Sequence, residues 1–371
     1  MRLLRVQVPD FRVLQNVDIT FEKDFFPNIF PLGSQNGGGK STLLQLIFGL
    51  LHCSGNPDRV DFLKNLLHGI KVYDRIKTIA LIDIWDGEKS ITLRFLLERN
   101  KKLITSTTEE SLGMIWDNDA NNYTNNTIEI CESEKEVLFC CLDKLDITKG
   151  KSFLKELSQK IFLAAPATQV FLFLSPNSRK LLFREQNEEN DYYSQLKEAK
   201  AKLPGFFTYD FMAVDLLTKS WKAAIAEDIK QVNETGKYGN SYKELIKDLH
   251  LILGNKKINL GMDFSSVTFK LDKDGETRDL YPEDLSHGEL KRLSIYMWLK
   301  YYNIENAIVL MDEIEIAFHP DWQYQIIADL KEWAPSNQYI LATHSYELCQ
   351  ALTPSHVKEL EPKLLKQQAS N

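Results

Sequence analysis

A glycine-rich loop between an apolar strand and an apolar helix constrains this chain more than any other feature. The loop reads Ser34-Gln35-Asn36-Gly37-Gly38-Gly39-Lys40-Ser41-Thr42. Residues 27–32 before it predict a short buried strand, and the apolar residues between 43 and 51 recur at helical spacing. This order places backbone N–H groups at the positive end of a helix dipole, where phosphate binds. The loop therefore predicts a phosphate site in an α/β fold.

The residue types within the loop match the chemistry of a polyphosphate site. Lys40 can reach the β- and γ-phosphates, and the Ser41 hydroxyl can hold Mg²⁺. We expect the other loop residues to line the same site, namely Asn36, Gly37, Gly38, Gly39 and Thr42. The usual pattern has a glycine where this chain has Ser34, and Gly33 lies one place earlier.

A second apolar run ends in carboxylates far along the chain. Residues 307–311 are apolar, as in a buried parallel strand, and Asp312 and Glu313 follow. Asp312 is placed to hold Mg²⁺ through water, and Glu313 is placed to deprotonate an attacking water. An ordinary core strand with a solvated acidic end gives the same pattern, but a phosphate loop in the same chain favours the catalytic interpretation.

A helix with a strong start signal lies between these two motifs. Ser286 and Glu289 have the spacing of a capping box, which predicts a helix running to about Tyr301. A well-capped helix needs no further explanation. The Ser286 hydroxyl and the Gly288 N–H nevertheless form a second candidate anion site at a helix N-terminus.

One more apolar strand is expected at residues 338–342, and Thr343-His344-Ser345 follows it. A histidine at the C-terminal tip of a strand can contact a γ-phosphate. A lone histidine is also common as a structural residue, so His344 is a candidate on its position alone.

These motifs, in this order, resemble the ABC-type ATPase heads of the RecF, SMC and Rad50 group. The subgroup of OLD-type ATPases and bacterial defence ATPases such as the Septu one is the most similar. The resemblance covers roughly residues 1–55, 165–180 and 257–350. It is carried by Asn36-Gly37, Gly39–Thr42, Leu285-Ser286, Gly288-Glu289, Asp312–Glu315, Phe318–Pro320, Thr343–Ser345 and an opening hairpin with Phe11-Arg12.

The resemblance implies an α/β fold: a P-loop ATPase head of mixed sheet with N-terminal antiparallel strands and a short helical insertion. It implies that two heads of a homodimer sandwich two ATP molecules with Mg²⁺. Ser286, Gly288 and Glu289 would then act in trans on the nucleotide. The residues that would act in cis are Lys40, Ser41, Asp312, Glu313 and His344.

Two further residues are candidates by resemblance. Arg12 belongs to a Phe-Arg step that usually lies near the nucleotide. Gln169, before the apolar run 170–174, is the nearest match to the family's glutamine that contacts Mg²⁺ or water. A polar residue at the start of a strand is the alternative interpretation of Gln169.

The motif positions predict three segments. Residues 1–180 form the N-terminal lobe of the head, residues 181–256 a helical insertion, and residues 257–371 the C-terminal lobe with the signature, carboxylate and histidine motifs. Helices are expected at 185–202, 214–232 and 241–253, strands at 78–84, 90–96, 257–271 and 277–280, a polar loop at 100–135, and a short amphipathic helix in the C-terminal tail.

Composition sets outer bounds on function. The formal net charge is −7, which argues against a broadly basic surface without excluding DNA or RNA. The five cysteines show no metal spacing, and Cys140-Cys141 lies in an apolar run, as expected of a reduced cytoplasmic protein. Neither a signal peptide nor an apolar run of about 18 residues is visible, so we expect no membrane span.

The sequence thus predicts a cytoplasmic Mg-ATP-dependent ATPase that dimerises through its heads and switches a separate effector in prokaryotic anti-phage defence. The segment after His344 is too short for the nuclease domain that OLD-type proteins carry, so we expect any nuclease to be another chain. Two alternatives stay open: a RecF-like repair ATPase acting on DNA, and a scaffold that binds ATP without hydrolysing it. A third, the nucleotide-binding subunit of a transporter, is disfavoured by Lys291-Arg292 after the signature and by His319-Pro320 after the carboxylates.

Overall fold

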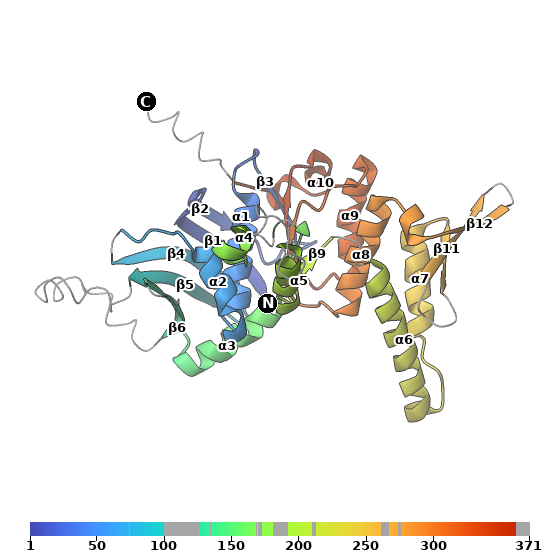
Figure 1. The fold of residues 1–371 in the computed structure, drawn as a ribbon, viewed down its shortest axis with the longest axis horizontal. Coiled ribbons are helices and arrows are strands. Elements are labelled where there is room, and N and C mark those ends of the chain that lie inside the picture. Colours follow the sequence, from blue (N-terminus) through green and yellow to red (C-terminus); the bar gives the residue numbers. More distant parts are fainter. Residues whose placement is uncertain are drawn as a thin grey trace, which may run out of the picture. The chain divides into compact units, whose positions relative to one another are not determined.

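The computed structural model describes residues 1–73, 75–99, 126–133, 135–167, 169, 173–180, 192–209, 213–260, 267–273 and 276–360. The chain divides into two compact units (Figure 1). The first comprises Met1–Phe207, Glu305–Ile314 and Ser336–Asn371, and the second comprises Thr208–Ile304 and Glu315–Pro335. These two units do not test the three segments that the motifs predict, so that division stays a prediction.

The first unit contains an antiparallel sheet in the order β2-β1-β4-β5-β7-β6. Its strands are β1 (Arg2–Phe11), β2 (Leu14–Thr20), β4 (Ile76–Trp85), β5 (Ser90–Arg99), β6 (Thr127–Glu132) and β7 (Glu136–Leu142). Buried and more exposed residues alternate along β4 and β5, as expected for strands with one face on the core. Cys140 and Cys141 are buried in β7, as expected.

Strand β6 lies inside the stretch that was expected to be a loop. That expectation is wrong for Thr127–Glu132, because Ile128 and Cys131 bury their side chains and the strand pairs with β7. The asparagine-rich residues 100–125 of the same stretch lie outside the described residues.

A second sheet of six strands has the order β15-β3-β14-β13-β8-β9. Its strands are β3 (Ile29–Gly33), β8 (Ile161–Ala165), β9 (Phe206–Thr208), β13 (Ile308–Asp312), β14 (Gln338–Thr343) and β15 (Lys358–Glu359). Strands β8, β13, β14, β3 and β15 pair in parallel. All of β13 and β14 is buried, which explains the apolar runs Ile308–Met311 and Tyr339–Ala342 within them. The expected α/β class with N-terminal antiparallel strands is confirmed.

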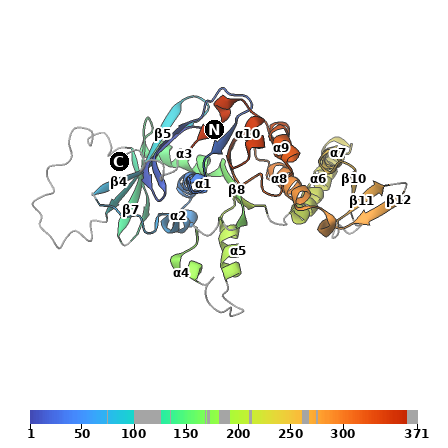
Figure 2. The ribbon, with the colours of Figure 1, turned by 90° about the horizontal axis from the view of Figure 1, so that it is seen from above.

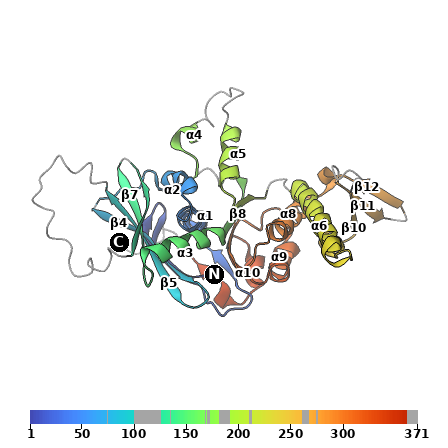
Figure 3. The same ribbon diagram turned by 90° about the horizontal axis from the view of Figure 1, so that it is seen from below.

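The helices of the first unit are α1 (Lys40–Phe48), α2 (Val60–Leu67), α3 (Ile147–Gln159), α4 (Pro176–Lys180), α5 (Tyr192–Lys202) and α10 (Tyr346–Gln350). A π-helical turn, Gly49–Cys53, continues α1. Helix α1 packs on β8, β13 and β14, and α3 packs on β6 and β8 (Figures 2 and 3). Every residue from Leu43 to Phe48 of α1 is buried. This part of the helix therefore has no exposed polar face.

The second unit consists of four helices and a small sheet. The helices are α6 (Ala213–Thr235), α7 (Ser241–Leu253), α8 (His287–Tyr301) and α9 (Pro320–Trp333). Helix α6 packs on α7 and α8 (Figure 2). The sheet has the order β10-β11-β12, formed by Lys256–Leu260, Val267–Lys273 and Glu276–Leu280.

The helical expectations for this region are confirmed at 214–232 and 241–253, and α5 accounts for the C-terminal part of 185–202. The single strand expected at 257–271 is instead two antiparallel strands, β10 and β11, because Lys257 pairs with Lys270 across the pair. The expected turn at 274–275 and the tail helix lie outside the described residues. Within the described ranges, we find no helix that is both long and apolar enough to cross a membrane.

Candidate nucleotide site

The glycine-rich loop joins β3 to α1 in the first unit. Gly37 and Gly39 have φ angles of 79° and 92°, a left-handed conformation that side chains disfavour. Among the described residues, no side chain caps α1, whose N-cap is Gly39 itself. A β-carbon on Gly38 would lie 2.3 Å from Ser34 Oγ. The loop therefore needs glycine at these positions, and its helix end suits an anion.

Lys40 is buried and lies across the loop. Its Nζ donates to Ser34 O at 3.0 Å and to Ser34 Oγ at 3.1 Å, and it lies 3.4 Å from Nδ1 of His344. Ser34, which stands where the usual pattern has glycine, thus supplies hydrogen-bond acceptors to Lys40. A phosphate entering the loop would replace these weak neutral acceptors with charged ones.

Ser41 and Asp312 meet although they are far apart in the sequence. Ser41 Oγ donates to Asp312 Oδ1 at 3.1 Å, and Asp312 is buried at the end of β13. Glu313 follows with a positive φ of 53°, and its N–H donates to Ala342 O at 3.0 Å. Positive φ in a residue other than glycine is uncommon and frequent at functional sites. The C-terminal edge of the parallel sheet therefore gathers a hydroxyl and two carboxylates.

His344 is placed by the end of β14. The strand ends at Thr343, whose Oγ1 accepts from the Ser345 N–H at 2.9 Å, and Ser345 Oγ then caps α10 by accepting from Leu348 N–H at 2.9 Å. These two local hydrogen bonds fix the turn that carries the exposed His344 ring toward Lys40.

Gln169 is attached to α1. The side-chain Nε2 of Gln45 donates to Gln169 O at 3.4 Å and also to Gln169 Oε1. Gln45 is buried on the same helix that begins with Lys40 and Ser41. The structure therefore links Gln169 to the phosphate-loop helix, while its contact with a metal stays a prediction.

Arg12 lies in the turn between β1 and β2. Its guanidinium donates from Nη2 to Leu66 O at 2.9 Å, at the C-terminal end of α2, and burial lowers its pKa. Leu14, the first residue of β2, lies against the loop, because a β-carbon on Gly39 would come within 2.6 Å of Leu14 Cδ2. Arg12 therefore belongs to a segment that covers the loop, and its nucleotide contact stays a prediction.

The signature residues lie in the second unit. Ser286 is exposed, its Oγ accepts from Glu289 N–H at 3.2 Å, and Glu289 Oε2 accepts from Ser286 N–H at 2.9 Å, so the expected capping box is present. Lys256 pairs with the Glu289 carboxylate. Burial acts to raise the pKa of Glu289, but the hydrogen bonds from Lys256 and Ser286 lower it below its ordinary value.

Gly288 has a packing reason to be glycine. A β-carbon there would lie 2.7 Å from Ala317 O and would touch the Trp322 ring. The start of α8 therefore lies against the backbone turn that precedes α9.

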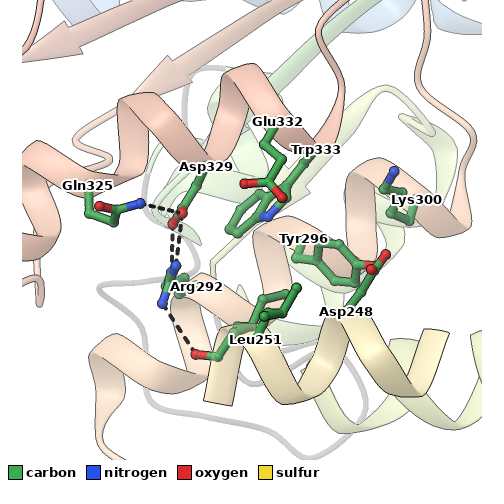
Figure 4. A pocket seen from close by; sticks show the side chains of 10 residues that line it. Asp248, Leu251, Arg292, Tyr296, Lys300, Gln325, Asp329, Glu332 and Trp333 are labelled. Carbon is green, nitrogen blue, oxygen red and sulfur yellow. Dashed lines mark hydrogen bonds and ion pairs between the residues drawn. The ribbon is translucent and has the colours of Figure 1, made fainter. Parts of the chain in front are cut away.

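Helix α8 is fixed to its neighbours by partly buried polar pairs (Figure 4). Arg292 donates to both carboxylate oxygens of Asp329 on α9, at 2.6 Å and 2.8 Å, and to Ile252 O on α7 at 3.2 Å. Tyr296 donates to Asp248 on α7 at 2.5 Å. Two-point pairing of this kind sets orientation as well as position. The exposed cap therefore belongs to a helix that is hydrogen-bonded to both α7 and α9.

The fold thus assembles one part of the predicted site within the first unit, namely Lys40, Ser41, Asp312 and His344. Asn36 is exposed, Thr42 is half-buried at the start of α1, and the signature residues belong to the other unit. Sequence reasoning missed two contacts, those of Ser34 with Lys40 and of Gln45 with Gln169. Gln45 had a signal, because it is polar within the apolar run 43–51.

A family model described as the AAA ATPase domain matches residues 1–349 of this chain. Retron Vc95 probable ATPase from Vibrio cholerae serotype O1 biovar El Tor is 40% identical over 52 residues, which are 14% of this chain and 10% of that protein. Retron Ec83 probable ATPase from Escherichia coli is 38% identical over 51 residues, which are 14% of this chain and 9% of that protein. The similarity to these relatives thus spans a small part of their length.

Two solved structures are also similar. The SMC head domain from Thermotoga maritima has a TM-score of 0.44 and 12% identity, covering 95% of this chain and 92% of that chain. The SmcHead bound to the C-winged helix domain of ScpA has a TM-score of 0.44 and 11% identity, covering 94% of this chain and 91% of that chain.

Proposed function

The chain belongs to the AAA ATPase domain family, and on this premise we propose that it binds Mg-ATP at the phosphate loop and hydrolyses it there. The observation that carries the proposal is the convergence of Lys40, Ser41, Asp312 and His344 through direct contacts. A hydroxyl and a carboxylate oxygen are ligands that Mg²⁺ prefers. The uncapped start of α1 suits the phosphates.

Each residue has a definite task in this proposal. Lys40 exchanges Ser34 for phosphate oxygens, and Ser41 and Asp312 open their mutual hydrogen bond to hold Mg²⁺. Bound Mg²⁺ neutralises charge that develops on the phosphates. Glu313 orients the attacking water and takes its proton, and the His344 ring contacts the γ-phosphate beside Lys40.

We further propose that two chains engage head to head and that Ser286, Gly288 and Glu289 of one chain complete the site of the other. The exposure of Ser286 supports this, because a serine on a capped helix can present its hydroxyl to a second molecule. Sedimentation of the full chain with and without Mg-ATP, together with phosphate release, tests both parts. We expect ATP-dependent dimers and turnover. Turnover by a monomer contradicts the head-to-head arrangement, and nucleotide binding without phosphate release favours the scaffold.

The similarity of a short stretch of this chain to two retron ATPases supports a setting in anti-phage defence. In this setting the chain acts with a separate effector such as a nuclease. The test is phage challenge of cells that express this chain alone, the protein encoded by the gene next to it alone, or both, with that second protein taken as the candidate effector. We expect protection only with both, and none when the chain carries Lys40→Ala. Protection by the chain alone, with DNA cleavage or binding by the purified protein, would favour the alternative in which it acts directly on DNA.

A further inference from the structure

A buried glutamine on the phosphate-loop helix has only half of its amide satisfied. Gln45 exposes 2% of its surface between Leu44 and Leu46. Its Nε2 donates to the backbone and side-chain oxygens of Gln169. Its Oε1 is buried and has no hydrogen-bond partner in the part of the chain that the structure describes. Buried polar atoms normally have partners, so this oxygen calls for an explanation.

A purely structural role explains the amide poorly. A leucine would fill the same space among apolar neighbours without leaving an acceptor unsatisfied. The Gln45 oxygen would be satisfied if both amides turned over, because Gln45 Oε1 would then face Gln169 and the Gln169 NH₂ group could donate to it. The same change removes Gln169 Oε1 from Gln45 and frees it for another partner.

We propose that Gln45 is a positioning residue that holds Gln169 in one of two hydrogen-bonding arrangements, a proposal that rests on the Mg-ATP site proposed above. In the arrangement that the structure shows, Gln45 Nε2 donates to Gln169 Oε1. In the other, Gln45 Oε1 accepts from Gln169 Nε2, and Gln169 Oε1 becomes an oxygen ligand for Mg²⁺. Gln45 thereby ties the metal contact to the helix that starts with Lys40 and Ser41.

Two substitutions separate positioning from packing. Gln45→Glu keeps the shape and the acceptor but removes the donor, so only the arrangement that frees Gln169 Oε1 remains. Gln45→Leu keeps the approximate volume and removes both groups. If Gln45 only fills space, Gln45→Leu should disturb the protein less than Gln45→Glu, which buries a carboxylate. If Gln45 positions Gln169, Gln45→Glu should keep the wild-type dependence on Mg²⁺ and Gln45→Leu should lose it.

The first measurement uses the full chain and does not depend on turnover. Thermal unfolding is followed with AMP-PNP plus Mg²⁺ and with AMP-PNP plus EDTA, since a ligand that binds the native state raises its unfolding temperature. We expect Gln45→Leu to keep the EDTA shift and to lose most of the additional shift caused by Mg²⁺. Gln45→Glu should retain that additional shift. Equal Mg²⁺-dependent shifts in the wild type and both variants would overturn the proposal.

The second measurement is the Mg²⁺ concentration for half-maximal ATP turnover. We expect Gln45→Leu to require roughly tenfold more Mg²⁺, corresponding to about 1.4 kcal/mol, and Gln45→Glu to require no more than the wild type. Gln169→Ala should raise the requirement similarly, and adding Gln45→Leu to it should have little further effect. Fully additive effects would contradict coupling through Gln169. Gln45→Met replaces the leucine variant if that protein does not fold.

The controls distinguish this proposal from the underlying one. If the wild type is not stabilised by AMP-PNP under either condition, the nucleotide site itself is wrong and this inference fails with it. If the wild type is stabilised and the Gln45 variants match it in metal dependence, the nucleotide site stands and only the role of Gln45 is refuted.

Discussion

The phosphate loop and the start of α8 are both helix ends suited to anions, but they are built in different ways. In the first unit, Lys40 approaches His344 and Ser41 bonds to Asp312, so side chains far apart in sequence are brought together by the parallel sheet. In the second unit, the hydrogen bonds of Ser286 run to Glu289, three residues along the same helix.

This difference has a functional meaning. A site assembled by the fold from distant strands can recognise its ligand within one chain. A motif assembled within one helical turn, and left exposed, can instead be presented to a second molecule, as we propose for Ser286. We therefore expect damage to the first to abolish binding, and damage to the second to spare binding while impairing a step that needs both heads.

The largest expected effect is at Lys40. Lys40→Ala removes the main positive charge that faces the phosphates, so we expect Mg-ATP binding to fall below detection in isothermal titration. Lys151→Ala, an exposed lysine on α3 in the same unit, is the matched control and should bind as the wild type does. If Lys40→Ala binds Mg-ATP with wild-type affinity, the loop is not the phosphate-binding site.

Next is Glu313. Glu313→Gln keeps the shape and removes the basicity, so we expect ATP to bind while turnover falls by at least ~10²-fold, the scale of a lost general base. Steady-state phosphate release measures the loss, with the exposed Glu156→Gln on α3 as control. If turnover is unchanged, another group activates the water.

An intermediate effect is expected at Ser286, where the comparison is tested most directly. Ser286→Arg places a bulky cation on the exposed cap, so turnover should fall about tenfold or more, equivalent to at least about 1.4 kcal/mol, while ATP binding by the protomer is retained. Ser152→Arg on the exposed face of α3 is the control.

Mixing provides a second arm of the Ser286 test. A heterodimer of Ser286→Arg with Lys40→Ala keeps one composite site with all its motifs, so part of the turnover should return unless both sites must act together. If Ser286→Arg alone loses ATP binding, Ser286 belongs to the nucleotide site of its own chain. That result would contradict a role for Ser286 at the site of a second chain.

The smallest expected effect is on stability, at Glu289. Its pKa is lowered in the folded protein, so its stabilising contribution is present above the unfolded-state pKa of about 4.5 and is lost as the pH falls through the lower folded value. We expect Glu289→Gln to lower the free energy of unfolding by about 1 kcal/mol at pH 7, with the difference shrinking below about pH 4.5. Urea unfolding at pH 7 and pH 4 measures it, and a difference independent of pH would contradict this account.

The same contrast explains what the sequence could predict. The start of α8 at His287 and its end at Tyr301 follow from local signals, the Ser286–Glu289 pair above all, and they were located correctly. Strand β13 was equally predictable, because Ile308–Met311 of this fully buried parallel strand form an apolar run.

Contacts that depend on tertiary structure could not be predicted in this way. Nothing local indicates that Ser34 accepts from Lys40, that Gln45 meets Gln169, or that Arg12 binds the end of α2. Strand β6 was missed for a related reason: only its pairing with β7 distinguishes the short alternation of Thr127–Glu132 from the polar stretch before it. Single-sequence patterns report periodicity and caps, whereas these features come from pairing partners.

The burial of Lys40 also has a consequence for ionic strength. With 6% of its surface exposed, the charge that meets the nucleotide is shielded from mobile ions, which screen exposed charges far more than buried ones. Salt should therefore change ATP affinity little. Any charge that contributes to engagement of two heads through the exposed cap faces solvent until contact, so added salt should weaken assembly first. A titration with potassium chloride would then yield chains that are loaded with nucleotide but remain apart.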